Sequence, residues 1–101
     1  MSPINVGEYG LIIYIDVAED ISANTNQIVL KDPDGNESTK TAELGTTTVV
    51  TNFGTLTANQ YMKYTLASGD IDEAGRWMVR GISTGSTDKR KTNWLPLVVK
   101  A

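Results

Sequence analysis

The fold of this chain is decided by residues 60–80, which run QYMKYTLASGDIDEAGRWMVR. Apolar and polar residues alternate before and after a central stretch rich in Gly and Asp. Alternation with a period of two predicts half-buried β-strands. The central residues 68–75 predict a corner, with one turn of 3₁₀ helix, between two strands. The side chains that this pattern places toward the core are Met62, Tyr64, Leu66, Trp77 and Val79.

Similar short segments occur along the whole chain of 101 residues, at intervals of about ten residues. The predicted strands cover 3–6, 10–17, 27–32, 37–43, 46–53, 60–66, 76–83 and 93–99, with loops over 18–26 and 84–92. The residues predicted to face the core in the first half are Leu11, Ile13, Ile15, Val17, Ile28 and Leu30, with Ile21 anchoring a loop. Pro96 removes a ladder donor from the last strand and predicts an edge or a bulge there.

Seven to eight short, mostly antiparallel strands in about 100 residues predict an all-β chain. The class that fits best is an immunoglobulin-like β-sandwich, formed by residues 1–101 as a single domain. Threonine, valine, isoleucine and tyrosine are frequent, and these branched and aromatic side chains suit a pleated surface.

The composition excludes several chemistries. The chain has no Cys and no His, which removes disulfides, thiolate nucleophiles, Cys-ligated zinc and the commonest general base. No phosphate-binding loop, dinucleotide fingerprint or catalytic triad is present. Nine basic against twelve acidic residues argue against a broad nucleic-acid footprint. We therefore expect a protein that is not an enzyme, needs no cofactor and binds no nucleic acid.

The chain also lacks the signals of membrane insertion and secretion. No apolar run approaches the roughly 20 residues that a membrane-spanning helix needs. The first residues have neither a basic segment nor an apolar one, so we expect no secretory signal.

Two acidic groups are candidate metal sites. The first is the turn Asp32-Pro33-Asp34-Gly35-Asn36-Glu37, and the second contains Asp70, Asp72 and Glu73. Neither matches the spacing of a calcium loop, and Asp and Gly favour turns without any metal. We expect solvated turns at both places, and a metal at Asp32/Asp34 or Asp70/Asp72 remains the alternative.

The basic run Lys89-Arg90-Lys91 and the aromatic Trp94 are candidate binding features. The basic run can meet an anionic partner or simply solvate a loop tip. Trp77 lies among alternating apolar residues and is expected in the core. Trp94 decides between two functions, because a core position favours a structural role and an exposed one favours stacking on a sugar.

The corner Glu73-Ala74-Gly75-Arg76-Trp77-Met78-Val79 is similar to the D-x-G-x-Y-x-C signature of immunoglobulin-like domains. Glu73 stands in place of the acid, Trp77 in place of the Tyr and Val79 in place of the Cys. The bridge of that family is therefore absent, and packing around Trp77 has to hold the fold.

More of the chain resembles small immunoglobulin-like structural proteins of tailed bacteriophages. These proteins typically contain V-G-x-x-G-x-x-I-x-x-D, K-P-D-G and Y-x-x-x-x-G-D-L-D-x-A-G-x-W in that order. This chain has Val6-Gly7-Glu8-Tyr9-Gly10 with Ile15-Asp16, then Lys31-Asp32-Pro33-Asp34-Gly35, and then residues 64–77. Asp32 is an extra residue within the second motif.

The resemblance implies a protein of the virion, assembled in the host cytoplasm as part of a tail, baseplate or tail fibre. It implies other virion subunits as partners, in a symmetric homo- or hetero-oligomer, and no catalytic residue. The alternative is a carbohydrate-binding module that contacts host glycans. Strand edges and terminal arms commonly dock on neighbouring sheets. The candidate partner-binding residues are Met1, Ile4, Val6, Glu37, Thr39, Thr41, Lys89, Arg90, Lys91 and Trp94.

Overall fold

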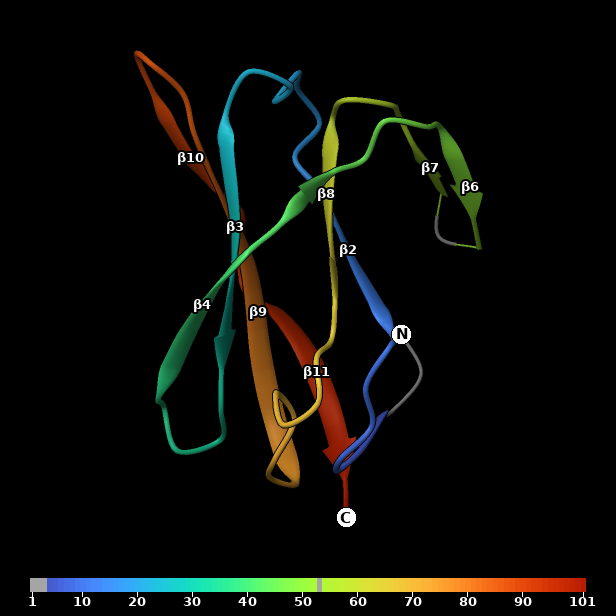
Figure 1. Cartoon of the computed structure of the whole chain (residues 1–101), viewed down its shortest axis with the longest axis vertical. Helices are drawn as coiled ribbons and strands as arrows, with labels where there is room; N and C mark the ends of the chain where they lie inside the picture. The colour runs from blue at the N-terminus through green and yellow to red at the C-terminus, as the bar shows by residue number, and fades with distance from the viewer. Residues whose placement is uncertain (1–3, 53) are drawn as a thin grey trace.

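A computed structural model describes residues 4–52 and 54–101, which form strands and turns and contain no helix (Figure 1). The prediction of an all-β chain is therefore confirmed. The strands are β1 (Ile4–Asn5), β2 (Ile12–Asp16), β3 (Thr25–Lys31), β4 (Glu37–Thr41), β5 (Glu43–Leu44), β6 (Val49–Thr51), β7 (Gly54–Leu56), β8 (Tyr61–Thr65), β9 (Gly75–Thr84), β10 (Lys89–Lys91) and β11 (Leu95–Lys100). A search of the described residues found no helix long and apolar enough to cross a membrane.

The strands form two main sheets and a separate ribbon. The larger sheet has the order β1-β11-β9-β3-β4, with β10 also paired to β9, and the smaller sheet has the order β2-β8-β5. Strands β6 and β7 pair only with each other among the described residues. All pairs are antiparallel except β1 with β11, which is parallel. The architecture is that of a β-sandwich-like protein with curled sheets.

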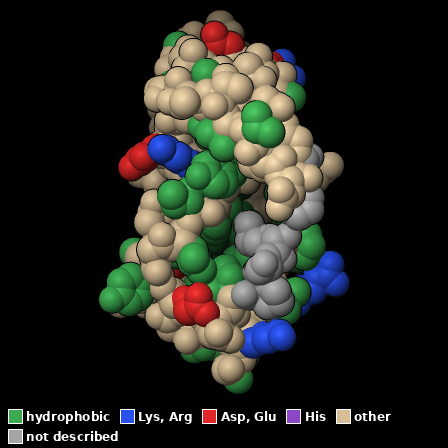
Figure 2. Space-filling view, turned by 90° about the vertical axis from the view of Figure 1, so that its right-hand side faces the viewer, with side chains coloured by type: hydrophobic (Ala, Val, Ile, Leu, Met, Phe, Trp, Pro, Cys, Tyr) green, Lys and Arg blue, Asp and Glu red, His purple; other side chains and the backbone are tan. Residues whose placement is uncertain are grey.

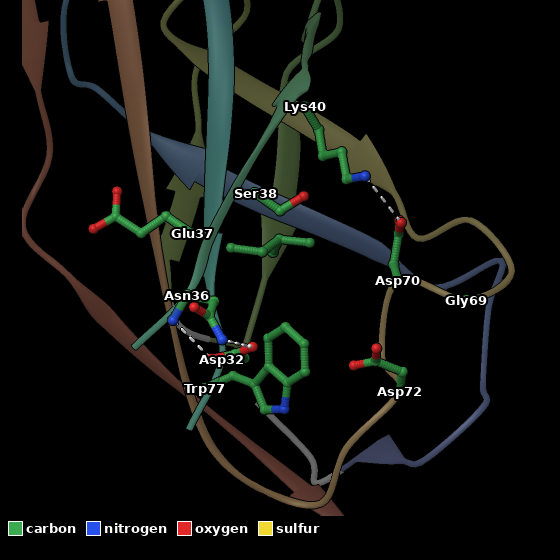
Figure 3. Close-up of a pocket in the computed structure, with 10 residues that line it drawn as sticks. Asp32, Asn36, Glu37, Ser38, Lys40, Gly69, Asp70, Asp72 and Trp77 are labelled. Carbon is green, nitrogen blue, oxygen red and sulfur yellow. Dashed lines mark hydrogen bonds and ion pairs between the residues drawn. The ribbon is translucent and has the colours of Figure 1, made fainter. Parts of the chain in front are cut away.

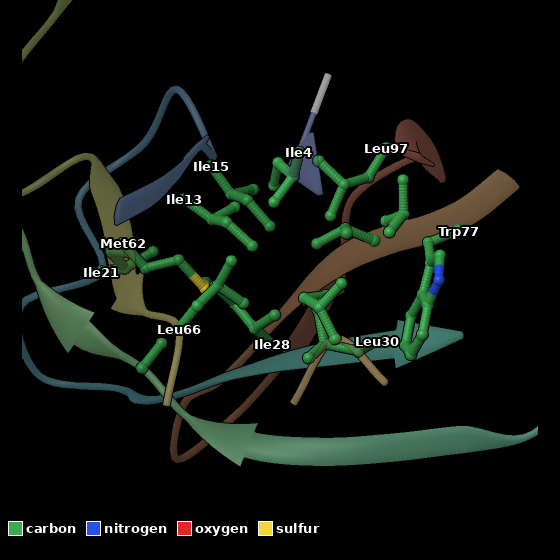
Figure 4. Packing of buried hydrophobic residues seen from close by; sticks show 14 residues of the cluster. Ile4, Ile13, Ile15, Ile21, Ile28, Leu30, Met62, Leu66, Trp77 and Leu97 are labelled. Atoms are coloured by element: carbon green, nitrogen blue, oxygen red, sulfur yellow. The ribbon is translucent and has the colours of Figure 1, made fainter. Parts of the chain in front are cut away.

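The core lies between the two main sheets (Figure 4). Trp77 and Val79 from β9 and Ile13 and Ile15 from β2 belong to one buried cluster, on the faces that the alternation predicted. Met62 is fully buried on β8. Each such side chain contributes roughly 1.5–3 kcal/mol by leaving water. The other core residues predicted from the sequence and buried here are Ile21, Ile28, Leu30 and Leu66.

Three predicted core positions are less buried than the alternation indicated. Leu11 is 42% exposed because β2 begins only at the next residue. Val17 and Tyr64 are half-buried and pack against the core from its margin. The hydrophobic pattern extends further along the chain than the paired strand does, so its ends lie at the rim of the sandwich.

The predicted strand over 37–43 is divided between the two sheets. β4 pairs with β3 in the larger sheet, whereas β5 pairs with β8 in the smaller one. Ala42 lies at the crossing, buried, and its N–H donates to the carbonyl of Asn26 at 3.0 Å. Gly45, shortly after the crossing, leaves room for the ring of Tyr61, because a Cβ there would overlap that ring. Nothing in a polar, evenly alternating segment marks a change of sheet.

Three predicted segments were wrong in detail. The predicted polar loop 84–92 contains β10, which folds back on β9 with Lys89 opposite Thr84. The predicted strand 46–53 is reduced to β6, and β7 follows it. The corner over 68–75 consists of turns and bends and has no 3₁₀ turn. Cross-strand pairing decides these segments, and a single strand's composition does not contain that information.

The last strand has the edge character that Pro96 predicted. β11 pairs with β9 along one side from Leu95 to Val99. On its other side β1 pairs only with Val99 and Lys100. Beside Pro96 the described residues therefore provide no second ladder, and the missing N–H costs no sheet hydrogen bond.

Candidate docking surfaces

The corner between β8 and β9 is held by the carboxylate of Asp70. The hydroxyl of Tyr64 donates to this carboxylate at 2.5 Å, and the N–H of Ala67 donates at 2.8 Å. Lys40 Nζ approaches it at 3.4 Å from β4 (Figure 3). Only 8% of the Asp70 side chain is exposed. Asp70 therefore joins the corner to both sheets.

These contacts shift the pKa values of Asp70 and Tyr64. Burial acts to raise the pKa of Asp70, but the hydrogen bonds from Tyr64 and Ala67 and the charge of Lys40 outweigh it, so the pKa lies below its ordinary value. Burial, followed by the hydrogen bond to Asp70 and its charge, raises the pKa of Tyr64 to about 12. A charged carboxylate and a neutral phenol are thus the stable pair at neutral pH.

Trp77 closes the same corner from the other side. Its indole N–H donates to the backbone carbonyl of Glu73 at 2.9 Å, and only 4% of the residue is exposed. Gly75, between them, has a φ of 137°. A Cβ at Gly75 would lie 2.7 Å from Cγ of Pro33, which brings this corner against the turn after β3.

A small hollow of about 170 Å³ separates β4 from the corner (Figure 3). Two of its carboxylates are already bonded within the chain. The carboxylate of Asp32 accepts from the N–H groups of Asp34 at 3.0 Å and Asn36 at 2.8 Å, which is a turn interaction. Asp70 is held as described above. The exposed side chains of Glu37, Ser38 and Asp72 also line the hollow.

Three carboxylates meet where the two turns touch. Oxygens of Asp32, Asp34 and Glu73 lie within 4.8 Å of one another. The hydrogen bond with Asp34, with burial and the neighbouring charges after it, raises the pKa of Glu73. The structure thus joins the Asp32/Asp34 pair to Glu73, whereas Asp70 is occupied elsewhere. Three carboxylates fall short of the six to eight oxygen ligands that calcium takes.

Trp94 lies on the outer face of the larger sheet and is neither a core residue nor a fully exposed one. It is half-buried, with the guanidinium carbon of Arg80 4.5 Å and Lys31 Nζ 5.3 Å from its ring centre. Arg80 Nε also donates to the carbonyl of Thr92 at 3.1 Å. Each cation–π contact at such a site contributes about 0.5–1 kcal/mol. Two basic side chains therefore hold the indole against the sheet.

The outer face of the larger sheet carries most of the chain's nine basic side chains. Successive side chains in a strand point to opposite faces, so positions between the buried ones point outward. We call this surface the basic face. Its basic residues, at outward positions of β3, β9, β10 and β11, are Lys31, Arg76, Arg80, Lys89, Lys91 and Lys100. Glu37 is the acidic residue at the outward strand positions that the structure describes.

The basic run divides between the two faces of β10. Lys89 and Lys91 are exposed on the basic face. Arg90 is at the opposite parity and is paired within the chain, to Glu19 at 3.4 Å and Asp88 at 3.5 Å. The β4 edge has Glu37, Thr39 and Thr41 exposed, as predicted for a polar edge strand.

The predicted N-terminal arm is used largely by the chain itself. Ile4 is 4% exposed and belongs to the core, so its assignment as a partner-binding residue was wrong. Val6 is 39% exposed, and its N–H donates to the carbonyl of Lys100 at 2.8 Å. Met1 lies outside the described residues.

One apolar surface was missed by the sequence analysis. A groove of about 510 Å³ lies between the β6–β7 ribbon and the edges of both sheets, lined in part by Tyr14, Leu56 and Leu95. Figure 2 shows the hydrophobic side chains around a hollow on this side of the molecule. Leu95 has the same parity as the buried Leu97, yet it is 47% exposed and lines this groove. Its parity was visible in the sequence, but its exposure depends on what lies across from it in the fold.

Comparison with known proteins gives no assignment: no family model, no curated protein and no solved structure matches the chain.

Proposed function

We propose that this protein is a non-enzymatic structural subunit of a tailed-phage virion that binds neighbouring subunits in the tail, baseplate or tail fibre. The observation that carries the proposal is the basic face with Trp94 at its centre. It presents six basic side chains together with an aromatic residue, and aromatic and arginine side chains are enriched where proteins bind one another.

The order of the strands supports an immunoglobulin-like sandwich. β11, β9, β3 and β4 follow one another as the G, F, C and C′ strands do in that fold, and β2, β8 and β5 follow the order B, E, D. The hydrogen bond from the Trp77 indole to Glu73 spans four residues. It is similar to the bond by which the corner tyrosine of immunoglobulin-like domains reaches the backbone a few residues upstream.

The decisive experiment is mass spectrometry of gradient-purified particles from a phage that encodes this chain. We expect the chain at a fixed, symmetric stoichiometry relative to the other tail proteins. Its absence from intact particles would reject the proposal. Trp94→Ala is expected to lower incorporation into particles without unfolding the protein, because Trp94 lies outside the core. Tyr9→Ala is the matched control, since Tyr9 is 66% exposed and lies in the connection between β1 and β2, outside the strands that form the basic face.

A second candidate, a carbohydrate-binding module, rests on the partial exposure of the same Trp94. Stacking on a sugar needs a free ring face. Arg80 and Lys31 already lie over the Trp94 ring, which weighs against this function. A glycan array read with wild type and Trp94→Ala distinguishes the two: binding that depends on Trp94 would favour the module, and a blank array would discard it.

A further inference from the structure

The chain carries two oppositely charged surfaces that have no partner within the described residues. On the basic face, Arg76, Lys89 and Lys91 form no ion pair there. Where the two turns meet, Asp32, Asp34 and Glu73 also have no basic partner. We call these three residues with the exposed Asp72 the acidic corner. Its crowding is visible in the positions of the carboxylates, because oxygens of Asp32, Asp34 and Glu73 lie within 4.8 Å of one another.

We propose that the acidic corner of one copy docks on the basic face of a second copy, which makes the chain associate head to tail. This rests on the proposed function as a subunit of an assembly, and it names a partner. The basic face extends over strands β3, β9, β10 and β11, whereas the acidic corner lies in two turns at one end of the sandwich (Figure 1). Contact between unlike surfaces repeats from copy to copy and closes into a ring when the rotation permits.

Charge complementarity favours a second copy as the occupant. Bringing cations to the acidic corner relieves the repulsion among its carboxylates, and the same contact satisfies the basic face. Apolar side chains lie between the cations, with Val98 51% exposed and Met78 and Trp94 half-buried. They supply the dry centre that a charged rim surrounds in stable interfaces.

The test measures the mass of the purified chain by analytical ultracentrifugation over a range of protein and salt concentrations. We expect species larger than the monomer at low salt, and fewer of them as salt screens the charges. Arg76→Glu with Lys91→Glu reverses the basic face, and Asp34→Lys with Glu73→Lys reverses the acidic corner. Each pair is expected to weaken association about tenfold or more. Mixing the two variants is expected to restore association, because every junction between unlike molecules then joins opposite charges.

The controls separate this interface from a general effect of net charge. Thr55→Glu with Thr57→Glu adds two negative charges at exposed positions on and beside β7, which in the described part of the chain pairs with neither main sheet, and should leave association unchanged. Arg76→Gln with Lys91→Gln changes the net charge of the chain by the same amount, but it does so on the basic face, and it should weaken association. Thermal unfolding checks that each variant is folded. If a charge-reversal variant does not fold, a neutral one takes its place: Arg76→Gln with Lys91→Gln for the basic face, or Asp34→Asn with Glu73→Gln for the acidic corner.

A wild type that stays monomeric at every salt and protein concentration would overturn the inference, as would a mixture of folded reversal variants that stays monomeric. Binding of poly-glutamate by a monomeric wild type would assign the basic face to a different acidic partner and would overturn it as well. None of these results touches the presence of the chain in virions, which mass spectrometry of particles decides separately.

Discussion

Asp70 concentrates more interactions than any other charged residue of the corner between β8 and β9. Its carboxylate accepts from a side chain on β8 and from the corner's own backbone, and it faces Lys40 on β4. Hydrogen bonds to a charged group are worth about 1.5–3 kcal/mol each, more than neutral ones, and a buried acceptor without its donors is costly. One residue therefore couples the corner to both sheets.

Replacing Asp70 by Asn is expected to destabilise the fold by about 1–3 kcal/mol at pH 7, because the charge that strengthens three contacts is lost. The folded-state pKa of Asp70 lies below the ordinary value of 3.8, so its contribution is present above that value and is lost as pH falls through the folded pKa. Thermal unfolding from pH 7 to pH 2 should show this acid loss in wild type and a smaller one in Asp70→Asn.

The partner of Asp70 titrates at the other end of the pH scale. The pKa of Tyr64 is raised from 10.0 to about 12, so its contribution is complete below pH 10 and is lost as pH rises toward 12. Tyr64→Phe is expected to lower stability at pH 7 by about 1 kcal/mol and to remove this alkaline loss. Equal alkaline loss in Tyr64→Phe and wild type would show that Tyr64 is not its source.

Glu73 is expected to behave in the opposite way to Asp70 at acid pH. Its hydrogen bond with Asp34 and the nearby carboxylates raise its pKa above 4.5, so the stability it gives is present below that value and is lost as pH rises. Glu73→Gln should therefore raise the Tm at pH 7, less so at high salt. Glu37→Gln is the matched control and should lower the Tm slightly, because Glu37 lies opposite Lys31 across β3 and β4. A lower Tm for Glu73→Gln would contradict the repulsion argument.

At the scale of the elements, the two turns that meet at Gly75 and Pro33 determine where the acidic corner forms. β3 and β9 are neighbours in the larger sheet, so the turn that follows β3 and the corner that precedes β9 emerge at the same end. Gly75 lets them touch, since any Cβ there would press on the proline ring. The charge of the acidic corner is thus a consequence of strand order.

Gly75→Ala is expected to destabilise the protein by more than Gly54→Ala does. The two residues have nearly the same positive φ, 137° and 134°, so the backbone strain of the two substitutions is matched. Gly54 has open space where a Cβ would lie, whereas a Cβ at Gly75 would lie 2.7 Å from Cγ of Pro33. Urea unfolding of the two variants isolates the contact as their difference, and equal losses would show that the turns do not press on each other.

At the scale of the whole molecule, one core joins both main sheets. Side chains from β2 and β8 pack against those from β3, β9 and β11 in a single cluster, and no disulfide is available to hold the sheets together. Separating the sheets would expose that whole cluster to water, which makes partial unfolding unfavourable. Stability therefore depends on packing around Trp77 and its neighbours.

We expect a single cooperative unfolding transition for the whole chain. Chains of this size usually unfold without populated intermediates, with an unfolding enthalpy of about 60–80 kcal/mol near the Tm. Tryptophan fluorescence, which reports Trp77 in the core and Trp94 on the basic face, should change together with far-ultraviolet circular dichroism. Transitions that differ between the two probes would show that the sheets unfold separately.

Much of the core was predictable from the sequence because alternation specifies which side of a strand is buried. Ile13, Ile28 and Trp77 are examples where pattern and structure agree. The parity of Leu95 was also visible, but its exposure was not, because it depends on which side chains lie across from it in the fold. Ile4 shows the same limit, since an apolar residue near a chain end can serve the core or a partner equally well. The basic run Lys89–Lys91 was predicted as a loop, because a run of charges does not reveal that the segment pairs with β9.

The sequence by itself determined the all-β character, the strand faces and the places where the chain turns, because these depend on residues close to one another along the chain. Only the tertiary structure decided that β4 and β5 belong to different sheets and that Glu73 meets Asp32 and Asp34. It also decided that Trp94 lies between Arg80 and Lys31 on one broad basic face. Those features depend on which strands become neighbours, and pairing between distant segments is set by the packing of the whole core.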